Sequence, residues 1–161
     1  MLRIGQPAPR FALPDADMEM VDLASFAGRK NVVLFFYPRD RSPGGAMEAE
    51  AFSDHAEEFA RCDTVILGVS RDDCLSHAEF RDRHGLAIPL LSDPDGEVCR
   101  LYGVLQEKEL DGVVRECVRR ATFVIDRKGI IRHADYDANP RHHVAEILEV
   151  VRRLKRTRAR V

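Results

Sequence analysis

The residues best suited to chemistry lie where a strongly apolar stretch gives way to a polar loop. Residues 31–37 (NVVLFFY) predict a strand buried on both faces, and this strand ends at Pro38. A loop that runs from the carboxyl end of such a strand into a helix gathers backbone N–H groups and the positive end of the helix dipole. A cysteine there would have a lowered pKa and act as a nucleophile, and a nearby arginine would stabilise a departing oxyanion. Residues 38–48 are therefore the first candidate site.

The cysteines do not form a recognisable redox or metal motif. They are Cys62, Cys74, Cys99 and Cys117. Their spacings exclude a C-x-x-C redox pair and a zinc knuckle. Cys74 falls in the first turn of a helix predicted at residues 72–84, where the helix dipole would favour its thiolate, so it is a second candidate nucleophile. Cys62 and Cys99 are predicted to be packing residues, and no chemistry requires Cys117.

The histidines do not predict a metal site. They are His55, His77, His84, His133, His142 and His143. His142 and His143 are adjacent on a predicted helix and would point about 100° apart, which is wrong for binding one ion. We expect surface or boundary positions for the histidines. The acidic run at residues 93–96 (DPDG) lacks the further ligands of a calcium loop and predicts a turn with a helix N-cap. We therefore expect neither a metal nor a cofactor.

The composition is that of one ordinary domain. The chain has 161 residues, of which 45% are hydrophobic and 32% charged, and its net charge is −2. These values exclude a disordered chain, and no apolar run approaches the roughly 20 residues that span a bilayer. Residues 1–10 contain no signal-peptide core, so we expect a cytoplasmic protein. The basic residues concentrate in a tail at about 152–161, which leaves the rest of the chain acidic, so we expect no nucleic-acid partner and no membrane partner.

The predicted strands and helices alternate along the chain. Strands are expected at residues 11–13, 20–23, 31–37, 64–69, 88–91, 113–118, 121–126 and 130–136. The first two would form a small hairpin and the last two another. Helices are expected at residues 46–61 and 72–84, within 93–102, and after Pro140, with a final buried stripe of Val144, Ile147, Leu148, Val151 and Leu154. This order predicts a single α/β domain over residues 1–161, compatible with a thioredoxin-like fold.

Several short motifs, in this order and at these spacings, resemble the peroxiredoxins of the AhpC/TSA family. The similarity is specifically to the bacterioferritin-comigratory-protein, or Q-type, subfamily. The motifs are GQPAPRFALPD at 5–15, FYP at 36–38, LGVS at 67–70, SHA at 76–78, HGL at 84–86, PLLSDPDG at 89–96 and TFVID at 122–126. The resemblance implies a thioredoxin-like three-layer sandwich with a mixed central β-sheet and an N-terminal β-hairpin extension.

The resemblance also assigns roles to the candidate site. The family's active-site pattern, Pro-x-x-x-Thr/Ser-x-x-Cys, falls on Pro38, Ser42 and Gly45, so glycine stands at the position of the peroxidatic cysteine. The family's supporting glutamate matches Glu48, and its arginine matches Arg120. In the family the cysteine thiolate attacks the peroxide and becomes a sulfenic acid. The proline shields the sulfur, the hydroxyl and backbone N–H groups orient the peroxide, and the arginine stabilises the leaving oxygen.

The resolving cysteine of the family is missing as well. The places where members carry it fall on Glu50 and Arg81. Members with one cysteine use an external thiol, so this second absence alone would not prevent turnover.

Three hypotheses follow from the resemblance. The chain is a peroxidase scaffold whose cysteine was replaced; or it is a non-catalytic binding or regulatory module that holds a peroxide-sized or anionic ligand against Arg120; or it is an enzyme that uses Cys74. A catalytically competent form would use hydrogen peroxide or an organic hydroperoxide with a thioredoxin-type reductant. Family members occur as monomers and as homodimers.

Overall fold

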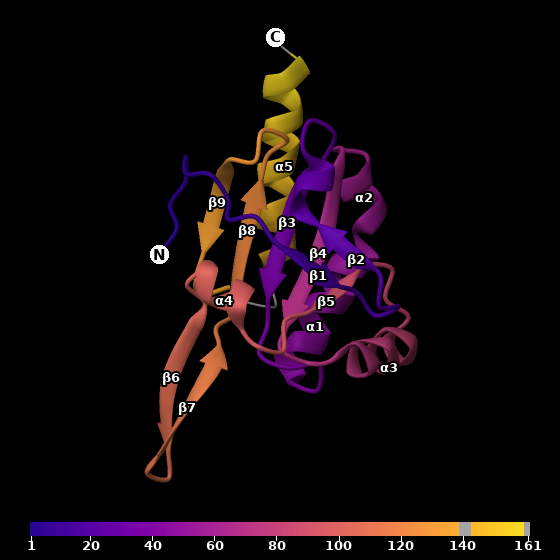
Figure 1. Cartoon of the computed structure of the whole chain (residues 1–161). Coiled ribbons are helices and arrows are strands. Elements are labelled where there is room, and N and C mark those ends of the chain that lie inside the picture. The colour runs from indigo at the N-terminus through magenta and orange to yellow at the C-terminus, as the bar shows by residue number, and fades with distance from the viewer. Residues whose placement is uncertain (139–142, 160–161) are drawn as a thin grey trace.

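A five-stranded mixed sheet organises the protein. The computed structural model describes residues 1–138 and 143–159 (Figure 1). The strand order is β5 (Leu90–Ser92), β4 (Thr64–Ser70), β3 (Asn31–Phe36), β8 (Ala121–Ile125) and β9 (Ile131–Asp135). The first three are parallel, whereas β8 runs antiparallel to β3 and β9 antiparallel to β8. The predicted thioredoxin-like α/β fold with a mixed sheet is confirmed.

The sheet is covered on both faces, so the structure has three layers. Side chains alternate across the central strand β3, and Val33 and Phe35 face one core while Leu34 and Phe36 face the other. The first core is completed by four helices: α1 (Pro43–Asp54), α2 (Ala56–Ala60), α3 (Cys74–His84) and α5 (His143–Ala159). The second is completed by the β1–β2 hairpin (Ala12–Pro14 with Met20–Asp22), the 3₁₀ helix η1 (Leu23–Phe26) and α4 (Glu97–Leu101). This double cover explains why all six residues of β3 are buried.

The prediction of one continuous helix over residues 46–61 is wrong in two respects: the helix starts earlier, and it is broken in the middle. The helix α1 begins earlier because Pro43 occupies its first turn, where a missing N–H costs little. The chain leaves helical geometry at His55 (φ −104°, ψ 8°) and resumes as the short α2. Apolar side chains continue at helical spacing across this break, since Phe52 and Phe59 are both buried in the same core.

The strand β6 (Leu105–Leu110) was not predicted. It pairs with β7 (Val113–Val118) in a separate two-stranded hairpin that projects from the body (Figure 1). The sequence LQEKEL lacks apolar alternation because only the base of this ribbon, at Leu105 and Val118, packs against the core. The Asp111-Gly112 turn, in which both residues have positive φ, is the signal that could have revealed the hairpin.

The remaining expected elements lie within a residue or two of their predicted bounds. The helix α3 starts after Asp73, whose side chain accepts a hydrogen bond from Ser76 N, and ends at Gly85 in the left-handed region. The stripe of α5 is confirmed as buried or partly buried. The basic residues from 152 to 159 belong to this helix, whereas Pro140 and His142 lie outside the described residues. No helix among the described residues is long and apolar enough to cross a membrane.

Candidate functional site

The loop after β3 leads directly into the first turn of α1. Ser42 precedes the helix with an extended backbone, and its hydroxyl donates a 2.7 Å hydrogen bond to the Arg39 carbonyl instead of capping the helix. Ser42 makes no capping hydrogen bond to the first turn of α1, so it leaves the backbone N–H groups of that turn to a ligand. Gly45 lies in this turn. The loop from the carboxyl end of β3 thus leads into a helix N-terminus, an arrangement that can stabilise an anion.

Sheet pairing brings Arg120 to this helix start from the far end of the sequence. The register pairs Phe36, the last residue of β3, with Ala121, the first residue of β8. Arg120 therefore emerges beside the loop that leads to α1. Its Nη2 donates a 3.4 Å hydrogen bond to the Ser42 hydroxyl, and its Nη1 lies 3.8 Å from Oε2 of Glu48.

Gly44 is a site residue that the sequence analysis missed. A Cβ built at this position would collide with the guanidinium of Arg120. A side chain here would therefore push the arginine away from the helix start. The Gly-Gly pair at the beginning of a helix was the available signal, because glycine is otherwise unfavourable there.

Glu48 is fully buried one turn into α1. Neither of its carboxylate oxygens has a hydrogen-bond partner among the described residues, and neither does Nη1 of Arg120. Burial raises the pKa of Glu48 to about 7; the charge of Arg120 opposes this shift, and the charge of Asp135 adds to it. The carboxyl group therefore exchanges its proton near neutral pH, directly beside Arg120.

This raised pKa predicts a pH-dependent stability. Between pH 4.5 and 7 the folded chain keeps a proton on Glu48 that the unfolded chain has released. Stability therefore falls as pH rises through this window, and we expect Glu48 to contribute a loss of about 3 kcal/mol in the free energy of unfolding. The variant Glu48→Gln should lack this contribution when urea unfolding is measured from about pH 4.5 to about pH 8. Glu57→Gln, at an exposed position on α2, should retain the slope of the unmodified chain. A Glu48→Gln slope equal to that of the unmodified chain would contradict the assignment.

A second buried polar network fixes the loop from the side of α3. Asp40 lies in the loop, and its carboxylate lies 2.9 Å from Nδ1 of His77. It also accepts hydrogen bonds from the hydroxyls of Tyr37 (2.7 Å) and Ser76 (2.8 Å). Burial by itself would raise the pKa of Asp40, but the hydrogen bond and charge of His77, with the two hydroxyls, hold it below its ordinary value. Sequence reasoning missed this network, since its members lie on separate elements.

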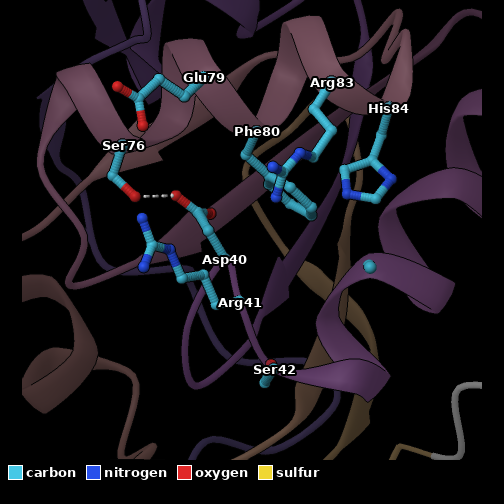
Figure 2. Close-up of a pocket in the computed structure, with 9 residues that line it drawn as sticks. Asp40, Arg41, Ser42, Ser76, Glu79, Phe80, Arg83 and His84 are labelled. Atoms are coloured by element: carbon cyan, nitrogen blue, oxygen red, sulfur yellow. Dashed lines mark hydrogen bonds between the residues drawn. The ribbon is translucent and has the colours of Figure 1, made fainter.

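A pocket of about 660 Å³ opens between this loop and α3. Figure 2 shows the loop residues on one side of it and the α3 side chains on the other. Its lining residues are Asp40, Arg41, Ser42, Ala46, Ser76, Glu79, Phe80, Arg83 and His84. Because Ser42 belongs both to the lining and to the Arg120 cluster, the pocket gives small molecules a route to the start of α1.

The other sequence candidates lie elsewhere. Cys74 is the first residue of α3 and is partly exposed, on a different loop from Arg120. Cys62 and Cys99 are buried in the two cores, which confirms their packing role, and burial raises the pKa of the Cys99 thiol far above its ordinary value. Glu50 and Arg81, at the resolving-cysteine positions, form surface ion pairs, with His84 at 2.6 Å and with Asp17 at 3.0 Å.

The expectation that the histidines lie at the surface or its boundary is wrong for two of them. His77 is fully buried because it pairs with Asp40, and His143 is 2% exposed because the first turn of α5 packs against the sheet. His55, His84 and His133 have intermediate exposure, as expected.

Comparisons with known proteins agree with this geometry. A sequence model of the AhpC/TSA family matches residues 4–134. A candidate peroxiredoxin of Mycobacterium tuberculosis H37Rv is 41% identical over 143 residues, which cover 89% of this chain and 90% of the relative. The peroxiredoxin Bcp of Escherichia coli K12 is 35% identical over 142 residues, which cover 88% and 90% of the two chains.

Solved structures give the same result. The peroxidoxin BcpB of Mycobacterium tuberculosis has a TM-score of 0.85 at 32% identity, with 95% of this chain and 98% of that chain covered. A cysteine-to-serine mutant of PrxQ from Xylella fastidiosa has a TM-score of 0.88 at 28% identity, with 95% and 97% covered. The sheet, the loop before α1 and these matches together show that the chain belongs to the AhpC/TSA family and is homologous to the Bcp and Q-type peroxiredoxins.

Proposed function

We propose that this chain is a Q-type peroxiredoxin scaffold without its peroxidatic thiol, and that it does not reduce peroxides in this form. The main support is the cluster at the start of α1. Arg120 reaches Ser42 and faces Glu48 there, in the turn that contains Gly45. The cluster keeps the groups that would orient a peroxide and stabilise its leaving oxygen, while glycine supplies no nucleophile.

The family's chemistry explains why the sulfur is indispensable. A thiolate attacks one peroxide oxygen, the O–O bond breaks, and the sulfur becomes a sulfenic acid while the other oxygen leaves and takes up a proton. In this proposal Pro38 shields the reacting centre, the Ser42 hydroxyl and the N–H groups of α1 orient the peroxide, and Arg120 stabilises the departing oxygen. A serine hydroxyl cannot replace the thiolate, because an alkoxide is poorly suited to the two-electron reduction of a peroxide.

A second candidate function is binding without turnover. The partly exposed side chain of Arg120 and the start of α1, which Ser42 does not cap, are both suited to a small anionic or peroxide-sized ligand. A ligand held there would make the chain a regulatory or binding module that retains the family's recognition groups.

The experiment that tests the proposal measures peroxide consumption by the purified chain. Hydrogen peroxide and an organic hydroperoxide are supplied separately, with dithiothreitol or a thioredoxin system as the reductant. We expect a rate no higher than that of reductant alone, because position 45 has no thiol. The variant Cys74→Ser is the matched control. Robust turnover by the unmodified chain would overturn the proposal, and its loss in Cys74→Ser would establish a relocated nucleophile.

A further inference from the structure

Polar side chains from β9 and α5 converge on one point away from the Arg120 cluster. Asp135 is the last residue of β9, and His143 and Glu146 lie one helical turn apart at the start of α5. One potential ligand atom from each of these three residues lies within 4.8 Å of those of the other two. Nδ1 of His143 is 3.7 Å from Oδ2 of Asp135 and 3.9 Å from Oε2 of Glu146. A nitrogen and two carboxylate oxygens thus face a common centre.

The histidine at this centre is buried, and the structure leaves its ring poorly satisfied. His143 is 2% exposed, and its Nε2 has no hydrogen-bond partner among the described residues. Its Nδ1 faces the two acids, but distances of 3.7 Å and 3.9 Å are too long for hydrogen bonds. Nε2 of the neighbouring His133 is also buried without a partner among the described residues, and the two rings lie 6.5 Å apart. Nδ1, the nitrogen that faces the two acids, therefore makes no hydrogen bond of normal length with either of them, and it is the atom that a ligand at this centre would meet.

The charges at the centre favour a cation. The carboxylates of Asp135 and Glu146 both approach the same nitrogen of this buried ring. Oδ1 of Asp135 is already occupied by the backbone N–H of Asp137, so the other oxygen, Oδ2, is the one that faces the histidine. A divalent ion would offset the repulsion and give Nδ1 of His143 a partner.

We propose that Asp135, His143 and Glu146 form a binding site for a divalent first-row transition metal ion such as zinc. One imidazole nitrogen with two carboxylate oxygens suits zinc and its neighbours, whereas calcium and magnesium prefer oxygen ligands alone. Side-chain adjustments of about 1 Å would bring the three atoms to the usual bond lengths of about 2.0–2.2 Å. The ion would tie the start of α5 to the sheet, independently of any activity at Arg120.

A second cluster in the described residues does not need this explanation. Asp40, Asp72 and His77 also lie close together, but their side chains are satisfied by one another and by neighbouring hydroxyl, carbonyl and backbone groups. The polar groups of the Asp40 cluster have hydrogen-bond partners, whereas Nδ1 of His143 has none of normal length. This contrast is why we place the metal between β9 and α5.

The test is direct metal binding to the chelator-treated chain. Zinc is titrated by calorimetry, and cobalt is titrated by its visible absorption, which reports the coordination geometry. We expect one equivalent of each metal, with no comparable affinity for magnesium or calcium. Glu146→Gln alters a side chain that is 73% exposed and should weaken zinc binding at least about tenfold without unfolding the chain. Asp135→Asn should have a larger effect.

The control is Asp137→Asn, two residues from Asp135 on a side chain that is 91% exposed. It should bind zinc as the unmodified chain does. Circular dichroism of every variant establishes that it is folded. The proposal is overturned if the chain binds no stoichiometric zinc or cobalt, if it prefers magnesium or calcium, or if both ligand variants keep full affinity.

Discussion

Replacing Gly45 with cysteine is expected to give the chain a peroxide reductase activity that the unmodified chain lacks. The new thiol would lie in the first turn of α1, where uncapped N–H groups and the helix dipole lower the pKa of a cysteine. The neighbouring position, Gly44, is in close contact with Arg120, so the guanidinium is near enough to stabilise both the thiolate and the leaving oxygen. The resulting sulfenic acid would need an external thiol such as dithiothreitol for its reduction, because neither Glu50 nor Arg81 supplies a resolving thiol.

Three controls separate this activity from a generic reactive thiol. Gly45→Ser provides a side chain of similar size without sulfur and should remain inactive. Adding Arg120→Met to Gly45→Cys should lower the rate by about 10²–10³-fold, the usual cost of removing one preorganised donor. Adding Cys74→Ser should change nothing. The rate is followed by loss of hydrogen peroxide, and the thiol pKa by its reaction with iodoacetamide across pH. A folded Gly45→Cys variant that stayed inactive would show that the site has degenerated beyond its missing sulfur.

Periodicity was sufficient for the elements that contact the core. The apolar run of β3 and the stripe of α5 predicted burial correctly, because a strand between two layers and a helix against a sheet each impose a strict pattern on the sequence. Periodicity does not predict β6, because most of the β6–β7 ribbon projects from the body and therefore needs no alternation of apolar and polar residues. The break at His55 was also invisible, as the apolar spacing continues across it.

The candidate site divides in the same way. The resemblance pointed to Ser42, Glu48 and Arg120, and the structure brings these three together through the register between β3 and β8. Neither Asp40 nor His77 stands out by residue type or spacing, since a loop aspartate and a helix histidine are ordinary surface residues. Their pairing depends on how α3 packs beside the loop, a contact between residues far apart in sequence. Only the three-dimensional structure shows that these two side chains meet.

Breaking this pair is expected to cost the protein much of its stability. Nδ1 of His77 faces the Asp40 carboxylate, and its Nε2 lies 2.9 Å from the carbonyl oxygen of Leu91. The buried ring therefore joins the Asp40 carboxylate to the Leu91 carbonyl. His77→Gln strands the carboxylate and should lower the free energy of unfolding by about 3–5 kcal/mol. Urea unfolding measures this loss, and Glu79→Gln, an exposed change on the same helix, should stay within about 0.5 kcal/mol of the unmodified chain.

Asp40→Asn should cost less, because the uncharged amide leaves no buried carboxylate without its partner. Combining Asp40→Asn with His77→Gln should cost less than the sum of the two single changes, because the double variant leaves no stranded charge. Strictly additive losses would show that the two side chains do not act as a pair.

The same pair should also control the geometry of the site. The backbone N–H of Asp40 donates a 2.8 Å hydrogen bond to Asp72, so both the side chain and the backbone of this residue hold the loop. Releasing the carboxylate allows Ser42 and the start of α1 to shift relative to Arg120. Because a misplacement of about 1 Å costs about 100-fold in rate, we expect Asp40→Asn to lower the peroxidase rate of Gly45→Cys by about 10–100-fold under conditions where the protein is folded. The thiol pKa should rise in parallel, since the thiolate moves away from the guanidinium. A full rate and an unchanged thiol pKa, together with reduced stability, would show that the pair supports the fold without positioning the site.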